Sequence, residues 1–256
     1  MCGISGIYSF KQNNGWLEKA RIRVSAMNET ERHRGPDDTG LWDNGRKLVL
    51  GHDRLSILDL SSAGHQPMMD PDTGNVIVFN GEIYNYRAIR KALQGQGVVF
   101  SSETDTEVIL KGYSFWGIDG LVRQLNGIFA FALWDRNADC LILCRDHMGV
   151  KPLYYYTNET ELVFASEVRS VLAAGVEKKL SPEGLYSYLM YGSVQEPFTL
   201  IEGIRSLPPA SYARIGGGGR DSLCPLLESG RWLYRKQSVS KRGLVAEQGE
   251  NRCAVS

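Results

Sequence analysis

The sequence has no net charge and no long apolar run. Lysine plus arginine and aspartate plus glutamate each number 29, so no overall field favours nucleic acid or an anionic membrane surface. The longest apolar runs, such as Ile128–Trp134, are far shorter than the roughly 20 residues that cross a bilayer. We therefore expect neither a nucleic-acid partner nor a membrane partner. The sequence does not specify an oligomeric state.

The sequence also lacks a secretory leader and a disulfide framework. No basic and apolar segment precedes Cys2, which predicts a cytoplasmic protein. The five cysteines are odd in number and irregularly spaced. Cys140 and Cys144 lie in a run typical of a strand, where their Cα atoms would be roughly 13 Å apart, whereas a disulfide needs about 7 Å or less. Two buried thiols are the preferred interpretation, and a metal site is the weaker alternative.

Histidines are few as well, and they lack the spacing of metal ligands. The four are His33, His52, His65 and His147. We expect them to be ordinary polar residues and predict no metal site.

What the sequence does contain is a series of short strands and hairpins with few helices. Predicted strands are Ile4–Phe10, Lys47–His52 and Asn75–Asn80, and predicted hairpins join Gly127–Asp135 to Cys140–Arg145 and Leu153–Tyr156 to Glu161–Ala165. Predicted helices are Glu82–Leu93, a helix that begins at a Thr104 and Glu107 capping box and ends near Phe115, and Ser181–Gly192. This grouping favours an α+β fold of antiparallel sheets covered by helices.

The pattern changes after residue 215. Residues 2–215 read as one domain, and Gly216–Gly219 have the composition of a flexible linker. Residues 220–256 show little periodicity of either kind, so we expect 216–256 to be a linker and a poorly ordered tail.

Cys2 is the residue with the most distinctive chemistry. Hydrolysis of an amide needs a nucleophile and a nearby base, and removal of Met1 would give Cys2 both. A free α-amine has an ordinary pKa of about 7.7–8.0, so it is substantially neutral near physiological pH. The alternative is a cysteine placed by chance at a frayed terminus.

Ten short motifs, in order along some 210 residues, support the catalytic interpretation. They are Cys2–Gly6, Arg32–Asp37, Gly51–Asp59, Gln66–Met68, Phe79–Tyr86, Ser102–Glu107, Leu125–Gly127, Arg145–Asp146, Lys151–Tyr155 and Phe164–Glu167. As a collinear set they resemble class II glutamine amidotransferases, and specifically the asparagine synthetase branch of that family.

The resemblance implies a fold and a reaction. The fold is the four-layer αββα sandwich of N-terminal-nucleophile hydrolases, with two antiparallel sheets packed between helices. The reaction is hydrolysis of glutamine to glutamate and ammonia through a thioester on Cys2. The resemblance makes Cys2, Asn80 and Gly81 catalytic, and it places at the substrate Arg54, Leu55, Ser56, Ile57, Leu58, Asn80, Gly81, Glu82 and Asp105.

The residue chemistry suits these roles but leaves alternatives open. Arg54 would bind the α-carboxylate as a bidentate fork, or form a surface ion pair. Asn80 and Gly81 would hold an oxyanion, or simply make a turn at the end of a strand. Asp105 would bind the α-ammonium, or stabilise the first turn of a helix. The Arg34–Asp37 segment is expected to be a shaped loop without a catalytic role.

The sequence departs from the family after the first domain. Asparagine synthetases continue into a domain that binds ATP and Mg²⁺ through a Ser-Gly-Gly-x-Asp-Ser loop, and Gly217–Ser222 resemble this loop only superficially. We expect a chain truncated before the synthetase domain, with no cofactor of its own and a separate synthetase chain as a candidate partner. A shifted reading frame is our hypothesis for the tail. The alternatives to an active glutaminase are an idle glutamine-binding module and an unstable fragment.

Overall fold

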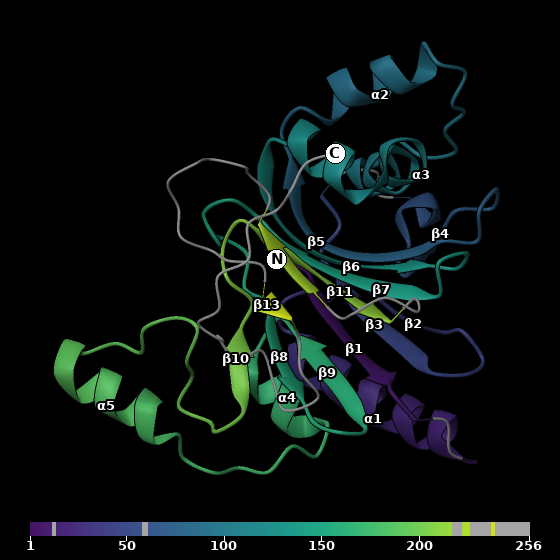
Figure 1. The fold of residues 1–256 in the computed structure, drawn as a ribbon. Helices are drawn as coiled ribbons and strands as arrows, with labels where there is room; N and C mark the ends of the chain where they lie inside the picture. Colours follow the sequence, from purple (N-terminus) through teal and green to yellow (C-terminus); the bar gives the residue numbers. More distant parts are fainter. Residues whose placement is uncertain (12–13, 58–60, 217–221, 226–236, 239–256) are drawn as a thin grey trace.

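The structure is a computed structural model that describes residues 1–11, 14–57, 61–216, 222–225 and 237–238 (Figure 1). Of 222–225 and 237–238 it describes only the backbone. Leu58, the motif-like Gly217–Gly219 and most of the predicted tail lie outside the described residues.

Two antiparallel sheets form the centre of the molecule. The first sheet has the order β10 (Ile204–Ser206), β8 (Tyr154–Thr157), β9 (Glu161–Ala165), β1 (Gly3–Ser9), β3 (Leu48–Arg54) and β2 (Asp38–Asp43). The second has the order β13 (Gln237–Ser238), β12 (Ser222–Pro225), β11 (Ser211–Gly216), β7 (Cys140–Arg145), β6 (Gly127–Asp135), β5 (Val76–Ile83) and β4 (Met68–Met69). Each strand pair is antiparallel, as predicted.

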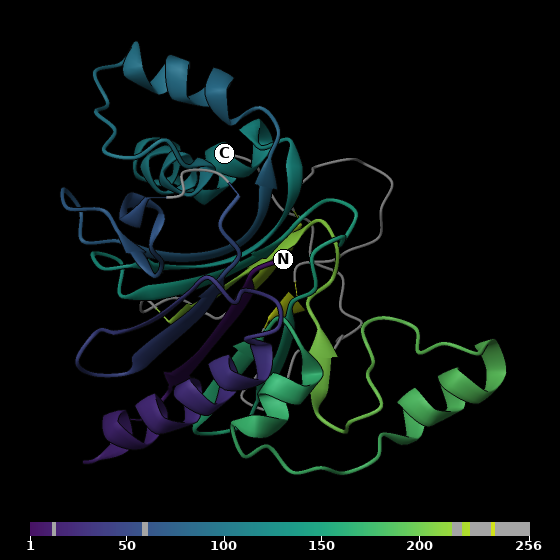
Figure 2. The ribbon, with the colours of Figure 1, turned by 180° about the vertical axis from the view of Figure 1, so that it is seen from behind.

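Helices cover the outer face of each sheet. Helices α1 (Trp16–Glu31) and α4 (Val168–Ala173) pack on the first sheet, and α3 (Asp105–Gln124) packs on the second, with α2 (Tyr86–Gln94) against α3. Figures 1 and 2 show the resulting four layers from opposite sides. A short 3₁₀ turn, η1 (Ser62–Gly64), precedes β4, and α5 (Pro182–Tyr191) projects from the body of the molecule. The predicted αββα sandwich is confirmed.

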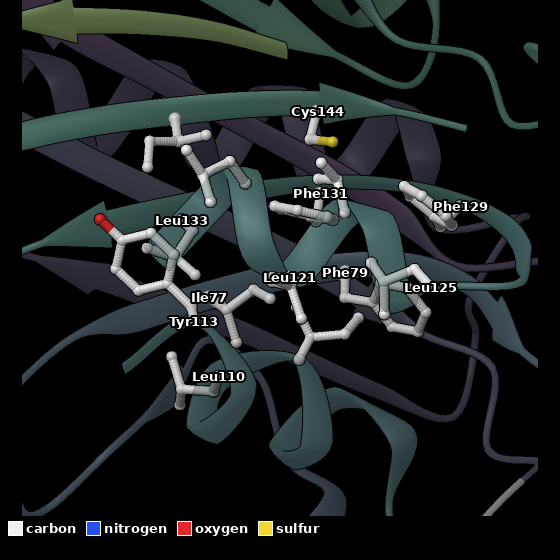
Figure 3. Close-up of a cluster of buried hydrophobic side chains, with 14 of the residues drawn as sticks. Ile77, Phe79, Leu110, Tyr113, Leu121, Leu125, Phe129, Phe131, Leu133 and Cys144 are labelled. Carbon is white, nitrogen blue, oxygen red and sulfur yellow. The ribbon is translucent and has the colours of Figure 1, made fainter. Parts of the chain in front are cut away.

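The strand sequences explain why the sheets are buried on both faces. In β6, Phe129, Phe131 and Leu133 point toward α3, while Ala130, Ala132 and Trp134 point toward the first sheet. Strand side chains alternate between faces, so a nearly continuous apolar run fills two cores at once. Figure 3 shows the outer core, where Leu110, Tyr113 and Leu121 of α3 face Phe129, Phe131 and Leu133.

Several predicted elements are confirmed. Both hairpins form, with β6 paired to β7 and β8 paired to β9. Helix α5 begins after Ser181, whose hydroxyl accepts a hydrogen bond from the Gly184 N–H at 3.0 Å, and it ends at Gly192 in the left-handed region. Cys140 and Cys144 are both buried on β7, as expected.

The alternative of a turn at Asn80 and Gly81 is wrong, as is the predicted end of the strand at Asn80. Strand β5 continues through both residues to Ile83, and α2 begins at Tyr86 rather than near Glu82. The register explains this, because Asn80 pairs with Ala130 and Gly81 with Phe129 of β6. A Cβ atom at Gly81 would collide with the backbone of β6, so glycine is required here by close strand packing and not by a turn.

The predicted end of the helix at Phe115 is also wrong. Helix α3 continues to Gln124, interrupted at Gly117, which has a φ of 66° that favours glycine. Its capping box forms only in part. The Thr104 hydroxyl accepts the Glu107 N–H at 3.2 Å, but the Glu107 carboxylate accepts the Ser102 N–H instead of that of Thr104.

Two features beyond the prediction extend the fold. Helix α1 buries Ala20, Val24, Met27, Asn28 and Glu31, which have the spacing of one helical face. Two of these five residues are polar, so the sequence shows no clear apolar period for this helix. Strand β12 pairs with β11, so the second sheet extends past the boundary predicted at residue 215. Among the helices in the described part of the chain, none has the length and apolarity needed to cross a lipid bilayer.

We expect Phe131→Ala to lower the free energy of unfolding by about 3–5 kcal/mol, because it leaves a cavity between β6 and α3. Phe115→Ala is the matched control, since Phe115 on α3 is 47% exposed and should cost far less. Urea denaturation measures both. Equal losses in the two variants would contradict the packing described for this core.

Candidate active site

The pairing of β1 with β3 brings Cys2 next to Arg54. The two strands are antiparallel, and Gly3 pairs with Asp53, so the residue before β1 lies beside the last residue of β3. Residues 52 positions apart in the sequence therefore share one end of the sandwich. The Leu55 N–H, just after β3, donates to the Cys2 Sγ at 3.4 Å.

The outer edge of β5 forms the facing wall. Strand β4 pairs only with Val76 and Ile77, so among the described residues β5 has no neighbouring strand beyond them on that side. Gly81 pairs with Phe129, whose own N–H and C=O bond instead to Asp146 on the opposite side. Alternation along an antiparallel ladder then directs the Gly81 N–H to the open edge. Within the described residues, no hydrogen bond uses this N–H.

The Asn80 side chain is a second unused group. It is 1% exposed, and neither its Nδ2 nor its Oδ1 has a hydrogen-bond partner among the described residues. A buried amide without partners costs free energy, so such groups in a protein interior call for an explanation. Both Asn80 and Gly81 line a cavity that also contains Cys2. A bound ligand would supply the missing partners.

Hydrogen bonds from two other elements hold Phe79, the residue before Asn80. The Phe79 N–H donates to Gln66 Oε1 at 2.7 Å, and the Phe79 carbonyl lies 3.1 Å from His52 Nε2. Burial lowers the pKa of His52 to about 4, so the ring is neutral near pH 7 and its Nε2–H can donate. His52 belongs to the first sheet and Phe79 to the second, so this bond ties the two walls together.

Arg54 is a buried cation in the same cavity. It is 6% exposed, and its Nη1 donates to the Ser61 carbonyl at 3.1 Å. Gly64 packs directly against the guanidinium, where a Cβ atom would collide with it. The guanidinium is thus fixed in position at the cavity wall, and it suits bidentate binding of a carboxylate.

Asp105 supplies a buried carboxylate at the first turn of α3. Its Oδ2 accepts a hydrogen bond from the Ile83 N–H at 3.0 Å. Ile83 is the next residue after Gly81 whose N–H points to the open edge of β5, and Asp105 occupies that N–H. Burial is the main cause that raises the Asp105 pKa to about 6, while hydrogen bonds from backbone N–H groups lower it. Asp105 therefore both ends the free edge and lines the cavity.

The Cys2 thiol is partly buried and faces these groups. Burial raises its pKa above the ordinary value, and the Leu55 N–H and the positive charges of the N-terminus and Arg54 oppose that rise. The Met1 ammonium donates to the Arg34 carbonyl at 3.0 Å. Met1 lines the cavity, so its removal would open more space beside the thiol.

Arg34 positions the backbone of Cys2. Its Nε donates to the Cys2 carbonyl at 3.0 Å, and its Nη1 forms an ion pair with Glu167 at 3.1 Å. The side chain is only 9% exposed, so this contact is shielded from solvent. No catalytic role is predicted for the Arg34–Asp37 loop, and Arg34 contributes a contact that positions Cys2.

The structure brings most of the predicted site residues into one cavity. Those that line it are Cys2, Arg54, Leu55, Ile57, Asn80, Gly81, Glu82 and Asp105. Ser56 is not among the lining residues, and its N–H donates to Asp37 Oδ2 at 2.8 Å. Leu58 is outside the described residues. Gln66 and Lys151 also line the cavity. Both belong to motifs that carry the family resemblance, and this is the sequence signal that points to them, although no role is predicted for either.

The histidines do not contribute to this cavity in the described part of the chain. His33 contacts Glu167 at 3.0 Å, and His65 contacts Asp38 at 2.7 Å. Over the same residues, no cluster of three histidine, cysteine or carboxylate side chains could hold a metal ion.

Comparisons with known proteins relate this cavity to known chemistry. Residues 1–223 match the family described as "Glutamine amidotransferase domain". The chain is 36% identical over 214 residues to asparagine synthetase [glutamine-hydrolyzing] 3 of Bacillus subtilis, which covers 82% of this chain and 34% of that protein. It is 40% identical over 242 residues to a putative asparagine synthetase [glutamine-hydrolyzing] of Mycobacterium bovis, which covers 89% of this chain and 36% of that protein.

A solved structure shares the fold. Glutamine phosphoribosylpyrophosphate amidotransferase from B. subtilis, solved with ADP and GMP, has a TM-score of 0.64 and 17% identity, over 89% of this chain and 50% of that one. The chain spans about a third of the length of the curated relatives it matches.

The neutral state of His52 predicts a pH dependence of stability. Its pKa is 6.5 in an ordinary environment and about 4 in the fold, so between these values the unfolded chain binds more protons and acid destabilises the fold. We expect His52→Gln, which keeps an N–H donor but has no basic nitrogen, to gain about 2 kcal/mol relative to the wild type between pH 7 and pH 5. Urea denaturation at both pH values measures the difference. A constant difference would contradict a neutral buried His52.

Proposed function

Because this chain belongs to the glutamine amidotransferase domain family, we propose that its cavity hydrolyses glutamine to glutamate and ammonia through a thioester on Cys2. The observation that carries the proposal is that one cavity holds a thiol, a fixed cation, a carboxylate and two unused N–H donors. Each of these groups matches one part of a free glutamine molecule or of the transition state for its hydrolysis.

Arg54 and Asp105 bind the two charged groups of the amino acid. The guanidinium takes the α-carboxylate through two parallel hydrogen bonds, and the Asp105 carboxylate takes the α-ammonium. Leu55, Ile57 and Glu82 line the path of the side chain between them and Cys2. A substrate that lacks either charge would forgo one of these two charge-assisted interactions, and this is the basis of selectivity for free glutamine.

Cys2 acts as an N-terminal nucleophile once Met1 is removed. The freed α-amine accepts the thiol proton, and the sulfur attacks the γ-carboxamide carbon. As the C–N bond breaks, the protonated amine returns the proton to the leaving nitrogen, which departs as ammonia. The amine then deprotonates a water molecule that attacks the thioester. Cleavage of the C–S bond releases glutamate and regenerates the thiol.

Asn80 and Gly81 stabilise the tetrahedral intermediates. Their Nδ2 and N–H groups provide donors for the oxygen that becomes negatively charged during attack. Such donors act without reorganisation when they are held in place beforehand. The bonds from Gln66 and His52 to Phe79 restrict the strand that carries both donors.

The ammonia would serve a synthetase. The relatives are named glutamine-hydrolyzing asparagine synthetases, and about two thirds of their length lies outside the matched region. We assign ATP and Mg²⁺ chemistry to that remainder, with a synthetase as the partner that receives ammonia. Glutamine hydrolysis on Cys2 consumes only water and needs no cofactor in this chain. We place the reaction in the cytoplasm, where the Cys2 thiol stays reduced.

Intact-mass spectrometry together with a glutaminase assay tests the proposal. We expect a purified chain shorter by one methionine, glutamine-dependent release of ammonia, and covalent labelling by a diazoketone analogue of glutamine. Cys2→Ala should abolish ammonia release and labelling. Cys140→Ala should retain both, because that thiol is buried in β7. Retention of Met1, or full activity in Cys2→Ala, would overturn the proposed catalyst.

Asp105 predicts how substrate use depends on pH. With a pKa of about 6 in the free protein, Asp105 loses its charge as the pH falls through 6, and attraction for the α-ammonium is lost with it. We expect kcat/KM to fall below about pH 6. In Asp105→Asn, KM should rise by about 100-fold, as for loss of a charge-assisted hydrogen bond of about 3 kcal/mol, and the decline near pH 6 should disappear. An unchanged KM would contradict the role of Asp105.

A further inference from the structure

Lys151 stands in the cavity with its backbone held firmly. It belongs to the loop between β7 of the second sheet and β8 of the first, so this loop crosses between the two walls (Figure 1). The Lys151 N–H donates to Asp146 Oδ2 at 2.9 Å, and its carbonyl accepts from Arg145 Nε at 2.9 Å. Asp146 also accepts the Val150 N–H at 3.0 Å. The root of the lysine side chain is thus fixed.

The Lys151 ammonium has no partner in the described part of the chain, although the residue is only 9% exposed. Lys111, the other buried lysine there, pairs with Asp70 at 2.7 Å and Asp72 at 2.6 Å. A cation at a largely buried position without a partner loses part of its hydration, and burial, with the nearby Arg34 charge, lowers the Lys151 pKa. An anionic ligand would relieve this cost.

The position of Lys151 indicates which part of a ligand would carry that charge. Besides Arg34, the groups whose charges act on the ammonium include Cys2, Asp146 and Glu82. Cys2 is the proposed nucleophile, and Glu82 directly follows Asn80 and Gly81. Lys151 lines the same cavity as these residues, so its charge acts at their end of the cavity. Arg54 already provides a cation for the α-carboxylate. Lys151, as a second cation in the same cavity, would therefore bind a different negative charge of the ligand.

We propose that Lys151 supplies positive charge at the reacting end of the cavity, where it stabilises the Cys2 thiolate and binds the γ-carboxylate of glutamate. The inference rests on the proposed function for the identity of that product. Glutamine is neutral at its γ-carboxamide, whereas glutamate is negative there, so Lys151 favours the product over the substrate. The consequence is inhibition by glutamate, which couples the rate of hydrolysis to the amount of product.

Two alkylating reagents of nearly equal size test the charge directly. Iodoacetate is an anion and iodoacetamide is neutral, so the ratio of their rates at Cys2, followed by peptide mass mapping at low salt, reports the local potential. We expect Lys151→Met to lower the iodoacetate-to-iodoacetamide ratio roughly five- to tenfold. Lys151→Arg should preserve the ratio. Lys179→Met is the matched control, because Lys179 is exposed and pairs with Glu202.

A purely structural role would change both alkylation rates together and leave their ratio unchanged, and that result would overturn the proposal. Lys151→Gln serves as a second neutral variant if Lys151→Met fails to fold, which thermal denaturation detects. Inhibition by glutamate provides an independent readout, and its inhibition constant should rise roughly tenfold in Lys151→Met while KM for glutamine changes little. The alkylation ratio can be measured without hydrolysis of glutamine. An inactive protein would therefore contradict the glutaminase proposal alone, whereas an unchanged ratio would contradict the role of Lys151 alone.

Discussion

The two hydrogen bonds to the backbone of Phe79 are the constraint on which the site depends. Gln66, from the loop before β4, accepts a hydrogen bond from the Phe79 N–H. His52, from the opposite sheet, donates one to the Phe79 carbonyl. They hold an unpaired strand edge at a set distance from β3, and β3 is in turn paired with β1, which carries Cys2. Without them, no hydrogen bond among the described residues would join the strand that carries Asn80 and Gly81 to β3, whose end lies beside Cys2.

The cavity is electrostatically unsatisfied as it stands. Burial raises the pKa values of Cys2 and Asp105 and lowers that of Lys151, so each shift favours the neutral form. Asn80 adds a buried amide without partners among the described residues. Perturbed groups of this kind concentrate at functional sites, where a ligand completes interactions that the protein alone leaves open. A zwitterionic amino acid brings both signs of charge at once.

The sequence predicts much of the fold because its strongest local signals agree with the tertiary structure. The β6–β7 hairpin and α5 each carry their own turn or cap, and they form as predicted. Helix α1 has no such signal, because its buried face includes Asn28 and Glu31. At Asn80 and Gly81 a local turn preference yields to strand pairing with β6, which no short-range pattern reveals.

The same distinction holds for the site. Cys2, Arg54 and Asp105 follow from motifs whose residue types suit the chemistry, and they line one cavity. Lys151 and Gln66 stood in motifs too, but their significance depends on what lies across the cavity from them. Lys151 reaches the cavity because the β7–β8 loop crosses between the sheets, and Gln66 because it bonds to the open edge of β5. Both are tertiary features.

The open edge of β5 also limits what can enter. An extended peptide binds a sheet by adding a strand, which requires a run of unsatisfied N–H and C=O groups along the edge. Here Gln66, His52 and Asp105 occupy the positions on either side of Gly81, so a single donor remains where a polypeptide would need several. An extended polypeptide therefore cannot pair along this edge as an added strand, and the edge offers one donor to a small ligand instead.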